Sequence, residues 1–355
     1  MVALNEAERA CLELNEDPPA LLSLEALARQ LLRAEAVASS RIEGLIVSHR
    51  KLARAFLNSG QHDTAAEVAA NVRAAERAIE LAATSATLSR DTLIEIHTIL
   101  FAETSSERLA GLIREEQNWV GGSPVSPLGA EFVPPPARFV EPALEDLIAF
   151  INRDDLPAAL QAAIAHAQFE TIHPFWDGNG RVGRALIHAI LRRRDVAPRY
   201  VPPVSLVLAE RADDYVKGLT AYRFGKEHDW YSLFAEALAT SALKARDFAD
   251  RVSELQEQWF EKAGNPRPQA GARKLILALP AHPVVDVVTA QAIIGASSQE
   301  TARQAIIRLT DAGVLRPISV GKKRDRLWES VGLFDLLDSF ERDVAPEGRA
   351  PHPSH

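Results

Sequence analysis

The stretch that decides the fold is His173-Pro174-Phe175-Trp176-Asp177-Gly178-Asn179-Gly180-Arg181-Val182-Gly183-Arg184. Apolar residues recur at helical spacing before it, over 158–172, and helical composition resumes over 183–194. The pattern predicts a loop between two helices, and we expect the first of these helices to be amphipathic.

The composition of this loop indicates a site for a phosphorylated ligand. Gly178 and Gly180 let the backbone approach a ligand closely, and the N-terminus of the following helix offers unpaired N–H groups at the positive end of its dipole. Arg181 and Arg184 lie three residues apart, so both guanidinium groups can reach polyphosphate oxygens. Two arginines at a helix N-terminus oppose the dipole, which favours an anionic partner between them.

Two further side chains of the loop add reactive groups. Asp177 is a hard oxygen ligand that suits Mg²⁺, because this ion takes one or two carboxylates beside nucleotide oxygens. His173 has an ordinary pKa of about 6.5, so it is largely neutral at pH 7 and can accept a proton from an attacking hydroxyl. A base, a metal ligand and a phosphate site are therefore predicted within one short loop.

With these residues in place, residues 173–184 resemble the signature of the Fic family. Members of that family transfer AMP, and occasionally other phosphate-containing groups, from a nucleotide to a Ser, Thr or Tyr hydroxyl of a protein. The resemblance implies that His173 is the general base, that Asp177 binds Mg²⁺ and that Arg184 binds the γ-phosphate of ATP. It also implies nucleotide-binding roles for Gly178, Asn179, Gly180, Arg181, Val182 and Gly183.

The identity of one glycine bears on the reaction type. Doc-type relatives, which phosphorylate their targets, resemble this motif but carry Lys where Gly180 stands. Gly180 therefore favours nucleotidyl transfer.

Residues 120–136 are rich in Gly, Ser and Pro and are predicted to form an irregular loop or short hairpin, which we call the flap. Under the resemblance, which covers about residues 24–242, the flap positions the target. Extended backbone at Phe132 and Val133 would pair with a target segment and align its hydroxyl. Residues 111–114 also look like a family feature.

Two residues downstream resemble nucleoside contacts. Tyr215 and Arg223 stand where the family tends to place groups that contact adenosine. For Tyr215, a place in the core is an equal alternative.

A second motif lies before the loop, in Ser39-Ser40-Arg41-Ile42-Glu43-Gly44. It ends a helix expected from about Leu24, with Gly44 as a left-handed cap. The run resembles the inhibitory motif of Fic proteins and implies that Glu43 pairs with Arg184 at the γ-phosphate position, as in class II members. The alternatives are an exposed Glu at a helix end, or a Glu43 that orients water for the reverse, de-AMPylating reaction.

Composition excludes several protein classes. The 47% hydrophobic and 25% charged content is that of a globular protein, and charges or prolines interrupt every apolar stretch before a bilayer is spanned. The single Cys11 excludes an internal disulfide and is expected to pack in a helix interface. The first residues carry no secretory pattern, so we expect a cytoplasmic protein without membrane contact.

The domain organisation follows from length and from breaks in helical composition. The predicted units are an N-terminal helical region (1–100) with the inhibitory helix (about 24–44), the Fic core (101–262), a linker (263–272), a winged helix-turn-helix (273–342) and a disordered tail (343–355).

The C-terminal unit is predicted from three helical stretches, 273–279, 287–294 and 298–312, and a hairpin over 318–328. From Ala270 to Val331 nine Lys or Arg face five Asp or Glu, a balance of +4 within a chain of net charge −8. DNA is a candidate partner, through a basic wing and an outward helix face, and protein docking is the alternative. The residues concerned are Lys322, Lys323, Arg324 and Arg326 in the wing and Thr301, Arg303, Gln304 and Arg308 on the helix.

The predicted fold class is mostly α, a Fic-type helical bundle with a short β-hairpin flap, followed by a winged helix-turn-helix. The predicted function is a protein adenylyltransferase that uses ATP and Mg²⁺, modifies a target protein or itself, and is autoinhibited by Glu43. The alternatives are a DNA-binding transcriptional regulator with a nucleotide-sensing Fic domain, and transfer of another group such as UMP or phosphocholine. The sequence leaves open whether the chain forms a homodimer.

Overall fold

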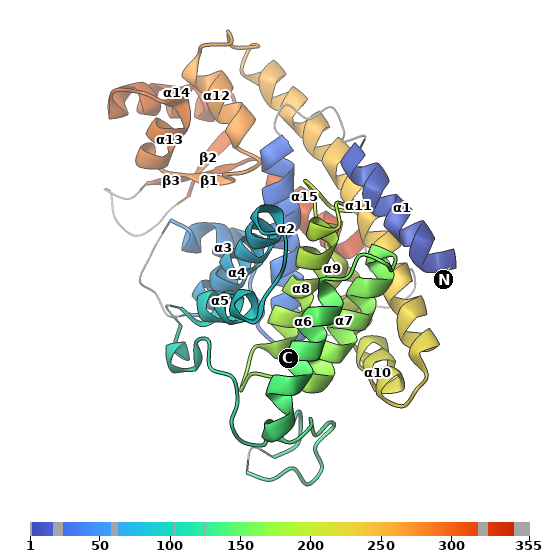
Figure 1. Cartoon of the computed structure of the whole chain (residues 1–355). Helices are drawn as coiled ribbons and strands as arrows, with labels where there is room; N and C mark the ends of the chain where they lie inside the picture. The colour runs from blue at the N-terminus through green and yellow to red at the C-terminus, as the bar shows by residue number, and fades with distance from the viewer. Residues whose placement is uncertain are drawn as a thin grey trace.

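Helices dominate the computed structural model, which describes residues 2–16, 24–57, 63–102, 104–123, 125–318 and 326–343 (Figure 1). The helices of the bundle are α1 (Val2–Glu16), α2 (Leu24–Ile42), α3 (His49–Ala55), α4 (Thr64–Thr84), α5 (Arg90–Phe101), α6 (Val140–Ile151), α7 (Ala158–Ile172), α8 (Asn179–Arg193), α9 (Val204–Glu210), α10 (Ala212–Arg223) and α11 (Glu227–Lys262). Two short 3-10 turns, Glu107–Leu109 and Ala137–Phe139, flank the flap. Among the described residues no helix combines the length and apolar character of a membrane span.

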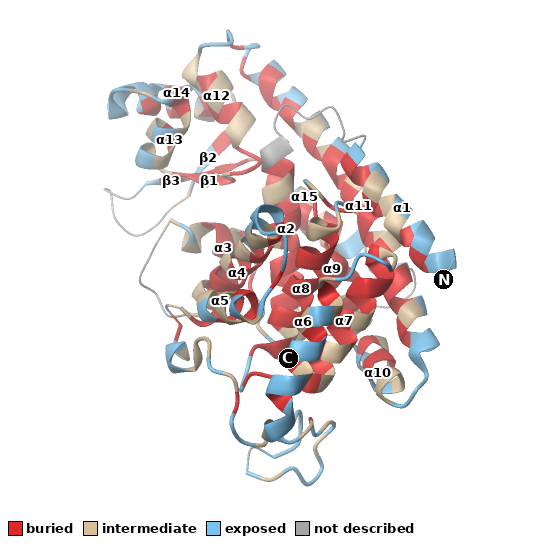
Figure 2. Ribbon diagram, viewed as in Figure 1, coloured by how far each residue is buried: buried red, intermediate tan, exposed pale blue. Residues whose placement is uncertain are grey.

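The helix α7 has the predicted bounds, but the expectation that it is amphipathic was wrong. It packs against α8, α6 and α1, and nearly all of its side chains are buried (Figure 2). Even the polar Gln161 is fully buried, and it donates to the backbone carbonyls of Phe150 and Arg153. The site is therefore built around a helix in the middle of the core.

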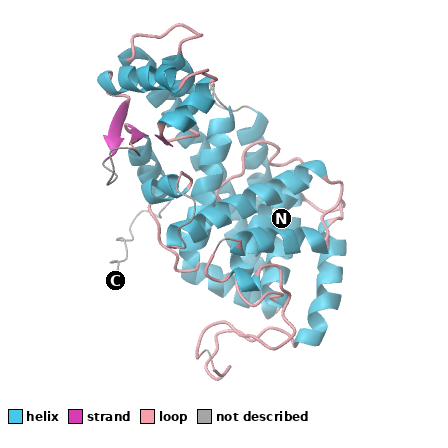
Figure 3. Ribbon diagram, turned by 90° about the vertical axis from the view of Figure 1, so that its left-hand side faces the viewer, coloured by secondary structure: helices cyan, strands magenta, loops and turns pink. Residues whose placement is uncertain are grey.

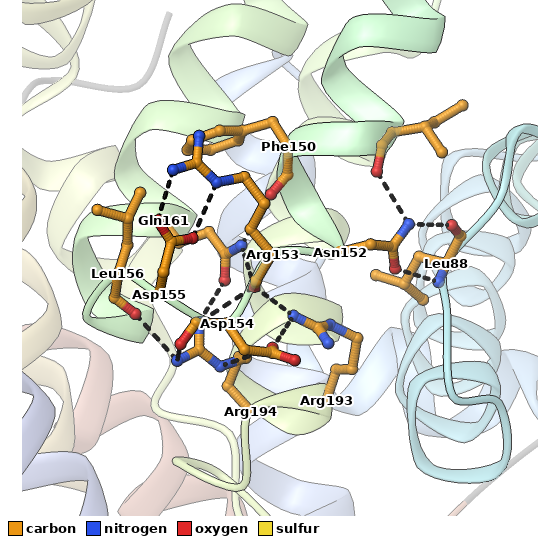
Figure 4. A network of polar contacts seen from close by, with 11 residues as sticks. Leu88, Phe150, Asn152, Arg153, Asp154, Asp155, Leu156, Gln161, Arg193 and Arg194 are labelled. Carbon is orange, nitrogen blue, oxygen red and sulfur yellow. Dashed lines mark hydrogen bonds and ion pairs between the residues drawn. The ribbon is translucent and has the colours of Figure 1, made fainter.

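The far end of the α7–α8 pair is held by a polar network (Figure 4). Arg193 and Arg194 end α8 and reach back to the connection between α6 and α7. Arg193 contacts the Asp154 carboxylate at 2.8 Å, and Arg194 donates to Gln161 Oε1 at 2.8 Å and to the Leu156 carbonyl at 2.9 Å. These contacts fix α7 against α8, and the motif joins the same two helices at their opposite end.

The flap leaves the bundle as an irregular loop with short bridges, as the sequence predicted. Val120 pairs with Phe132, and Ser123 with Ser126. The flap extends from one end of the molecule, and the strands of the C-terminal unit lie toward the other end (Figure 3).

The C-terminal unit follows α11 after a segment without helix or strand. Its elements are α12 (Gly271–Ala278), β1 (Val284–Val285), α13 (Val287–Ile294), α14 (Gln299–Asp311), β2 (Leu315–Ile318), β3 (Leu327–Ser330) and α15 (Leu333–Asp343). The strands form an antiparallel sheet of order β1-β3-β2, with Val284 opposite Glu329 and Leu315 opposite Ser330.

The three predicted helices of this unit are present, close to their expected bounds. The predicted hairpin is present as well, although β2 begins at Leu315 and β3 ends at Ser330, so its strands reach beyond the expected 318–328. The turn between them lies outside the described residues, as do Lys322, Lys323, Arg324 and the predicted tail from 344 onward.

Cys11 is fully buried on α1, which lies along α11. Burial raises the pKa of its thiol, so it is a packing residue as expected and not a nucleophile.

Candidate active site

The motif loop, residues 173–178, connects α7 to α8 through two left-handed residues. His173 ends α7 with φ 51° and ψ 61°, and Gly178 precedes α8 with φ 76°. A side chain at Gly178 would collide with Phe101 and Leu100, whose atoms lie 2.7 and 2.9 Å from the Cβ position. Glycine is therefore required at this turn by conformation and by space.

Asn179 holds the loop together from inside. Its Nδ2 donates to the Phe175 carbonyl at 2.8 Å, and its Oδ1 accepts from the Phe175 N–H at 2.9 Å. Asn118 donates to the same carbonyl at 3.0 Å. Because the Asn179 amide is used in this way and is 2% exposed, Asn179 faces a ligand only through its backbone.

Behind the loop lies His97 on α5, which sequence reasoning missed. Its ring stacks on the Phe175 ring at 3.8 Å between centroids. Nδ1 accepts from the Gly111 N–H at 2.9 Å, so Nε2 carries the proton and donates to the Asp177 carbonyl at 3.0 Å. Burial lowers the pKa of His97 to about 4 and keeps the ring in this neutral tautomer.

Arg114 ties the loop to the base of the flap. It is 2% exposed and donates to the carbonyls of His173 at 2.8 Å, Ile172 at 3.2 Å and Pro135 at 2.6 Å. Its own N–H donates to the Pro174 carbonyl at 2.9 Å. The sequence marked residues 111–114 only as a family feature, and this positioning role was not foreseen because its partners lie far along the chain.

His173 is neutral at pH 7 in this setting. Burial, and then the charge of Arg114, lower the pKa of His173 to about 4, against opposing contributions from the Glu170 backbone and the Glu43 carboxylate. Its Nδ1 has no hydrogen-bond partner among the described residues. The ring is therefore able to accept a proton.

The first two turns of α8 carry the two predicted cations. Arg181 lies 5.4 Å from the Phe101 ring and 3.6 Å from the Asp177 carboxylate, and its Nε is buried without a partner among the described residues. Arg184 is 1% exposed. Both positive groups thus add to the positive end of the helix dipole, which is an arrangement for binding an anion.

Glu43 occupies this anion site. Its carboxylate accepts from Arg184 at 2.7 Å, and Arg184 also donates to the hydroxyl and the carbonyl of Ser39, both at 2.8 Å. The same carboxylate lies directly over Gly180, where a side chain would collide with it. Burial opposes ionisation of Glu43, but the Arg184 charge and hydrogen bond outweigh it and lower the pKa of Glu43.

The end of α2 presents Glu43 through a glycine cap, as predicted. Gly44 has φ 79° and donates its N–H to the Arg41 carbonyl at 2.9 Å, while Leu45 donates to the Ser40 carbonyl at 3.0 Å. These two bonds form a Schellman motif, which fixes the direction in which Glu43 leaves the helix.

A buried cluster anchors the middle of α2 to α8 and α9. Glu35 accepts from the Ser205 N–H at 2.8 Å and from its hydroxyl at 2.5 Å, and lies 2.9 Å from His188 Nε2. Glu35 precedes Ser39 by one helical turn, and His188 follows Arg184 by one turn. The two helices therefore contact through successive turns, and sequence spacing within either helix alone did not reveal it.

The remaining predicted nucleotide-binding residues face the protein interior. Val182 is buried, and Gly183 packs against α7, where a side chain would meet Glu170 Oε1 at 2.5 Å. Glu170 itself was not predicted. Burial raises the pKa of its carboxyl to about 7, and Oε1 has no partner among the described residues.

Tyr215 and Arg223 lie on α10, which packs against α7. The Tyr215 hydroxyl is buried and bonds His166 Nε2 at 2.7 Å, which is the core position that the sequence left open. The Arg223 guanidinium lies 3.6 Å from the centroid of the Phe132 ring and within 3.4 Å of the Thr171 hydroxyl. Arg223 thus connects α10 to the flap.

The flap exposes apolar side chains beside the loop. Val125 and Leu128 are 86% and 87% exposed, and Val133 is 48% exposed. Trp176 of the motif loop is also exposed.

Asp177 is the only acidic side chain of the motif loop, and its side chain is 58% exposed. Among the described residues no three acidic, His or Cys side chains form a metal cluster. A single accessible carboxylate beside an anion site fits Mg²⁺ held mainly by nucleotide oxygens and water, and does not fit a metal held by protein ligands alone.

Two family models match the chain. The model described as the Fic/DOC family matches residues 87–191, and the one described as the Fic/DOC family N-terminal matches residues 1–80. Together they include the motif loop and the helix that carries Glu43.

Curated relatives are similar over the middle of the chain. Protein adenylyltransferase fic-1 of Caenorhabditis elegans is 33% identical over 132 residues, which is 36% of this chain and 23% of the relative. A probable protein adenylyltransferase of Aquifex aeolicus is 44% identical over 64 residues, which is 18% of this chain and 20% of the relative. The chain thus spans about a quarter or less of the length of these two relatives.

Solved structures share the fold over a larger part of the chain. A Fic family protein from Desulfovibrio desulfuricans superposes with a TM-score of 0.57 at 21% identity, covering 94% of this chain and 97% of its own. Fic-1 of Caenorhabditis elegans superposes with a TM-score of 0.54 at 23% identity, covering 69% and 71%.

Proposed function

The chain carries a Fic domain behind a Fic N-terminal region, and from this premise we propose that it is a protein adenylyltransferase, a nucleotidyltransferase that moves AMP from ATP to a protein hydroxyl. The observation that carries the proposal is the neutral, half-buried His173 at the entrance to an anion site formed by Arg181, Arg184 and the N-terminus of α8. Relatives named protein adenylyltransferase support the same activity.

In the proposed reaction His173 removes the proton of a Ser, Thr or Tyr hydroxyl. The hydroxyl oxygen then forms a bond to the α-phosphorus of ATP while the bond to the bridging oxygen of the β-phosphate breaks, and pyrophosphate leaves. Arg181, Arg184 and the N–H groups of α8 stabilise the negative charge on the phosphates. Arg114 keeps His173 in its left-handed conformation through the two carbonyls it binds.

Asp177 would hold Mg²⁺ together with phosphate oxygens, and the ion would neutralise part of their charge. The flap residues Phe132 and Val133 would pair with an extended target segment. Since the Arg223 guanidinium stacks on the Phe132 ring, it would fix the position of the paired segment relative to α7.

We propose further that the chain is autoinhibited. The Glu43 carboxylate and a γ-phosphate are both anions that require Arg184, so ATP binds productively only when Glu43 leaves. We expect Glu43→Gly to raise AMP transfer at least tenfold, because ATP no longer competes with a half-buried ion pair worth about 1.4 kcal/mol or more.

The test is incorporation of labelled ATP with Mg²⁺, followed by mass spectrometry of the protein and of candidate targets. Glu43→Gly should incorporate label, including on its own hydroxyls, with a mass shift that identifies the donated group. The double variant Glu43→Gly/His173→Ala should incorporate none. Equal incorporation by Glu43→Gly and the double variant would contradict catalysis by His173.

The reverse reaction is tested on a pre-modified target. If Glu43 orients a water for de-AMPylation, wild type should remove AMP and Glu43→Gly should not. Removal by both proteins would assign the water to another group.

A second candidate function is DNA binding by the C-terminal unit, which we propose as a winged helix-turn-helix. It is favoured by the exposed side chains of Thr301, Arg303 and Gln304 on α14 and by the +4 charge balance of residues 270–331. Arg308 is exposed as well, and it also donates to the Ala263 carbonyl at 2.9 Å. Salt-dependent binding of a duplex that His173→Ala leaves unchanged would support this function.

A further inference from the structure

The last helix of the chain contacts the inhibitory motif. In Figure 1 α15, the last helix of the C-terminal unit, lies against the bundle, where it packs on α11 and α3. Its residue Glu341, 16% exposed, binds Arg41 Nη2 at 2.5 Å and His49 Nε2 at 2.9 Å. One carboxylate of the C-terminal unit therefore contacts two elements of the N-terminal region.

These two partners lie on either side of Glu43 in the chain. Arg41 is two residues before Glu43, in the last turn of α2, and His49 is the first residue of α3. The segment between them, 42–48, carries Glu43 and the glycine cap. Glu341 thus holds both ends of the short segment whose conformation places Glu43 over Gly180.

Glu341 is a charged group in this position. Burial opposes its ionisation, but the hydrogen bonds and charges of His49 and Arg41 outweigh it and lower the pKa of Glu341. Arg41 is also 3.6 Å from Glu210 on α9 and accordingly stays close to the bundle when Glu341 is absent. Glu341 therefore adds one anchor to the end of α2, and α2 does not depend on it to fold.

The other anchors of α2 lie toward its beginning and middle. Gln30 donates to the Pro280 carbonyl, Arg33 donates to the Ala281 carbonyl at 2.8 Å, and Glu35 contacts α8 and α9. Asn71 of α4 donates to the Ala36 carbonyl and the Ser40 hydroxyl, both at 3.0 Å. The last residues of the helix, next to Glu43, are held by Arg184, Glu210 and Glu341.

We propose that Glu341 is a positioning residue for the inhibitory motif, through which the C-terminal unit keeps Glu43 on Arg184. The inference rests on the proposed function, in which Glu43 restrains AMP transfer. It assigns to the C-terminal unit a role in the resting state of the active site, whichever partner that unit binds.

The test is AMP incorporation by the full chain carrying Glu341→Gln. Loss of a partly buried ion pair should free Glu43 part of the time and raise incorporation about fivefold. Asp343→Asn is the matched control, since Asp343 is on the same helix but pairs with Arg251 of α11. We expect Asp343→Asn to behave as wild type.

Measuring Glu341→Gln in the Glu43→Gly background distinguishes a role of Glu341 that acts through Glu43 from a merely structural one. If Glu341 acts through Glu43, Glu341→Gln should add nothing once Glu43 is absent. General loosening of the protein would change incorporation in both backgrounds, and that result would overturn the proposal. Hydrogen exchange at residues 42–48 should increase in Glu341→Gln and not in Asp343→Asn.

The two proposals fail in different ways. Inactive Glu43→Gly protein would refute the proposed function. Active Glu43→Gly protein together with a Glu341→Gln variant as restrained as wild type would overturn only the role of Glu341. If Glu341→Gln does not fold, His49→Ala removes one of the two partners of Glu341, leaves the Arg41–Glu210 pair intact and should also raise incorporation above wild type.

Discussion

The charge state of His173 depends on its surroundings, and the pKa of its ring can be measured. Burial lowers its pKa to about 4, compared with about 6.5 in a peptide, so the neutral form persists throughout pH 5–8. We expect its ring signal in an NMR titration to show a midpoint near pH 4. The signal is identified by its loss in His173→Ala, and a midpoint between 6 and 7 would contradict the buried environment.

We expect Glu43 to stabilise the fold, in addition to restraining AMP transfer. Glu43→Gln removes the negative partner of the buried Arg184 and should lower the free energy of unfolding by about 1–2 kcal/mol. This is less than for a fully buried pair, because the Glu43 side chain is 34% exposed.

The sign of the pH dependence follows from the lowered pKa of Glu43. Its contribution is complete above its ordinary pKa of about 4.3 and is lost as the pH falls through the lower value in the folded state. Denaturant unfolding of wild type and Glu43→Gln should therefore differ at pH 7, and the difference should shrink as the pH falls below about 4. A difference that grows on acidification would contradict this account.

At the scale of elements, the contact of α2 with α8 places Glu43 and depends on Glu35. Glu35→Ala leaves the Ser205 N–H and hydroxyl buried without their acceptor and should cost about 2–4 kcal/mol of unfolding free energy. Urea unfolding followed by tryptophan fluorescence measures this. Glu80→Ala is the control, because Glu80 is an exposed helical residue of α4 and its loss should cost under about 0.5 kcal/mol.

Most helices of the site could be predicted from the sequence, because a change in composition marks their ends. Gly and Pro residues bound the loop between α7 and α8, and Gly44 marks the end of α2. The burial of α7 could not be predicted in this way. Gln161 and Glu170 are polar and lie on opposite faces of α7, yet other parts of the protein cover both.

Residues that act on distant parts of the chain were the ones that sequence reasoning missed. Arg114 binds carbonyls 58 and 59 residues away, and Glu35 binds Ser205, 170 residues away. A lone arginine or glutamate in a helical sequence gives no signal of such a partner. The pairing of Glu43 with Arg184, at a separation of 141 residues, was predicted only because both lie in motifs that resemble a family.

At the scale of the whole molecule, the C-terminal unit shares the core of the bundle. Phe340 of α15 stacks on Phe248 of α11 at 4.6 Å, and Trp259 of α11 donates to the Val331 carbonyl at 3.0 Å. The buried apolar cluster runs without a break from α1 to α15. We therefore expect the chain to unfold in one cooperative transition.

Arg50 on α3 is the charged centre of the contact between the bundle and the C-terminal unit. Its replacement tests whether the two unfold cooperatively. It lies 2.9 Å from Asp335, 3.5 Å from Asp338 and 3.6 Å from the buried Glu329. Arg50→Ala leaves Glu329 with fewer cations and should lower the free energy of unfolding by about 1–3 kcal/mol.

Loss of Arg50 acts on the contact between the two units more than on either unit, so their unfolding should separate. Calorimetry of Arg50→Ala should show a calorimetric enthalpy larger than the van't Hoff enthalpy, or two resolved transitions. Arg90→Ala is the control, because Arg90 pairs with Glu141 within the bundle and its removal should leave a single transition. If both variants unfold in one transition with equal enthalpies, the apolar contacts of α11 with α15 alone couple the two units, and the charges around Arg50 contribute only to the local position of α3.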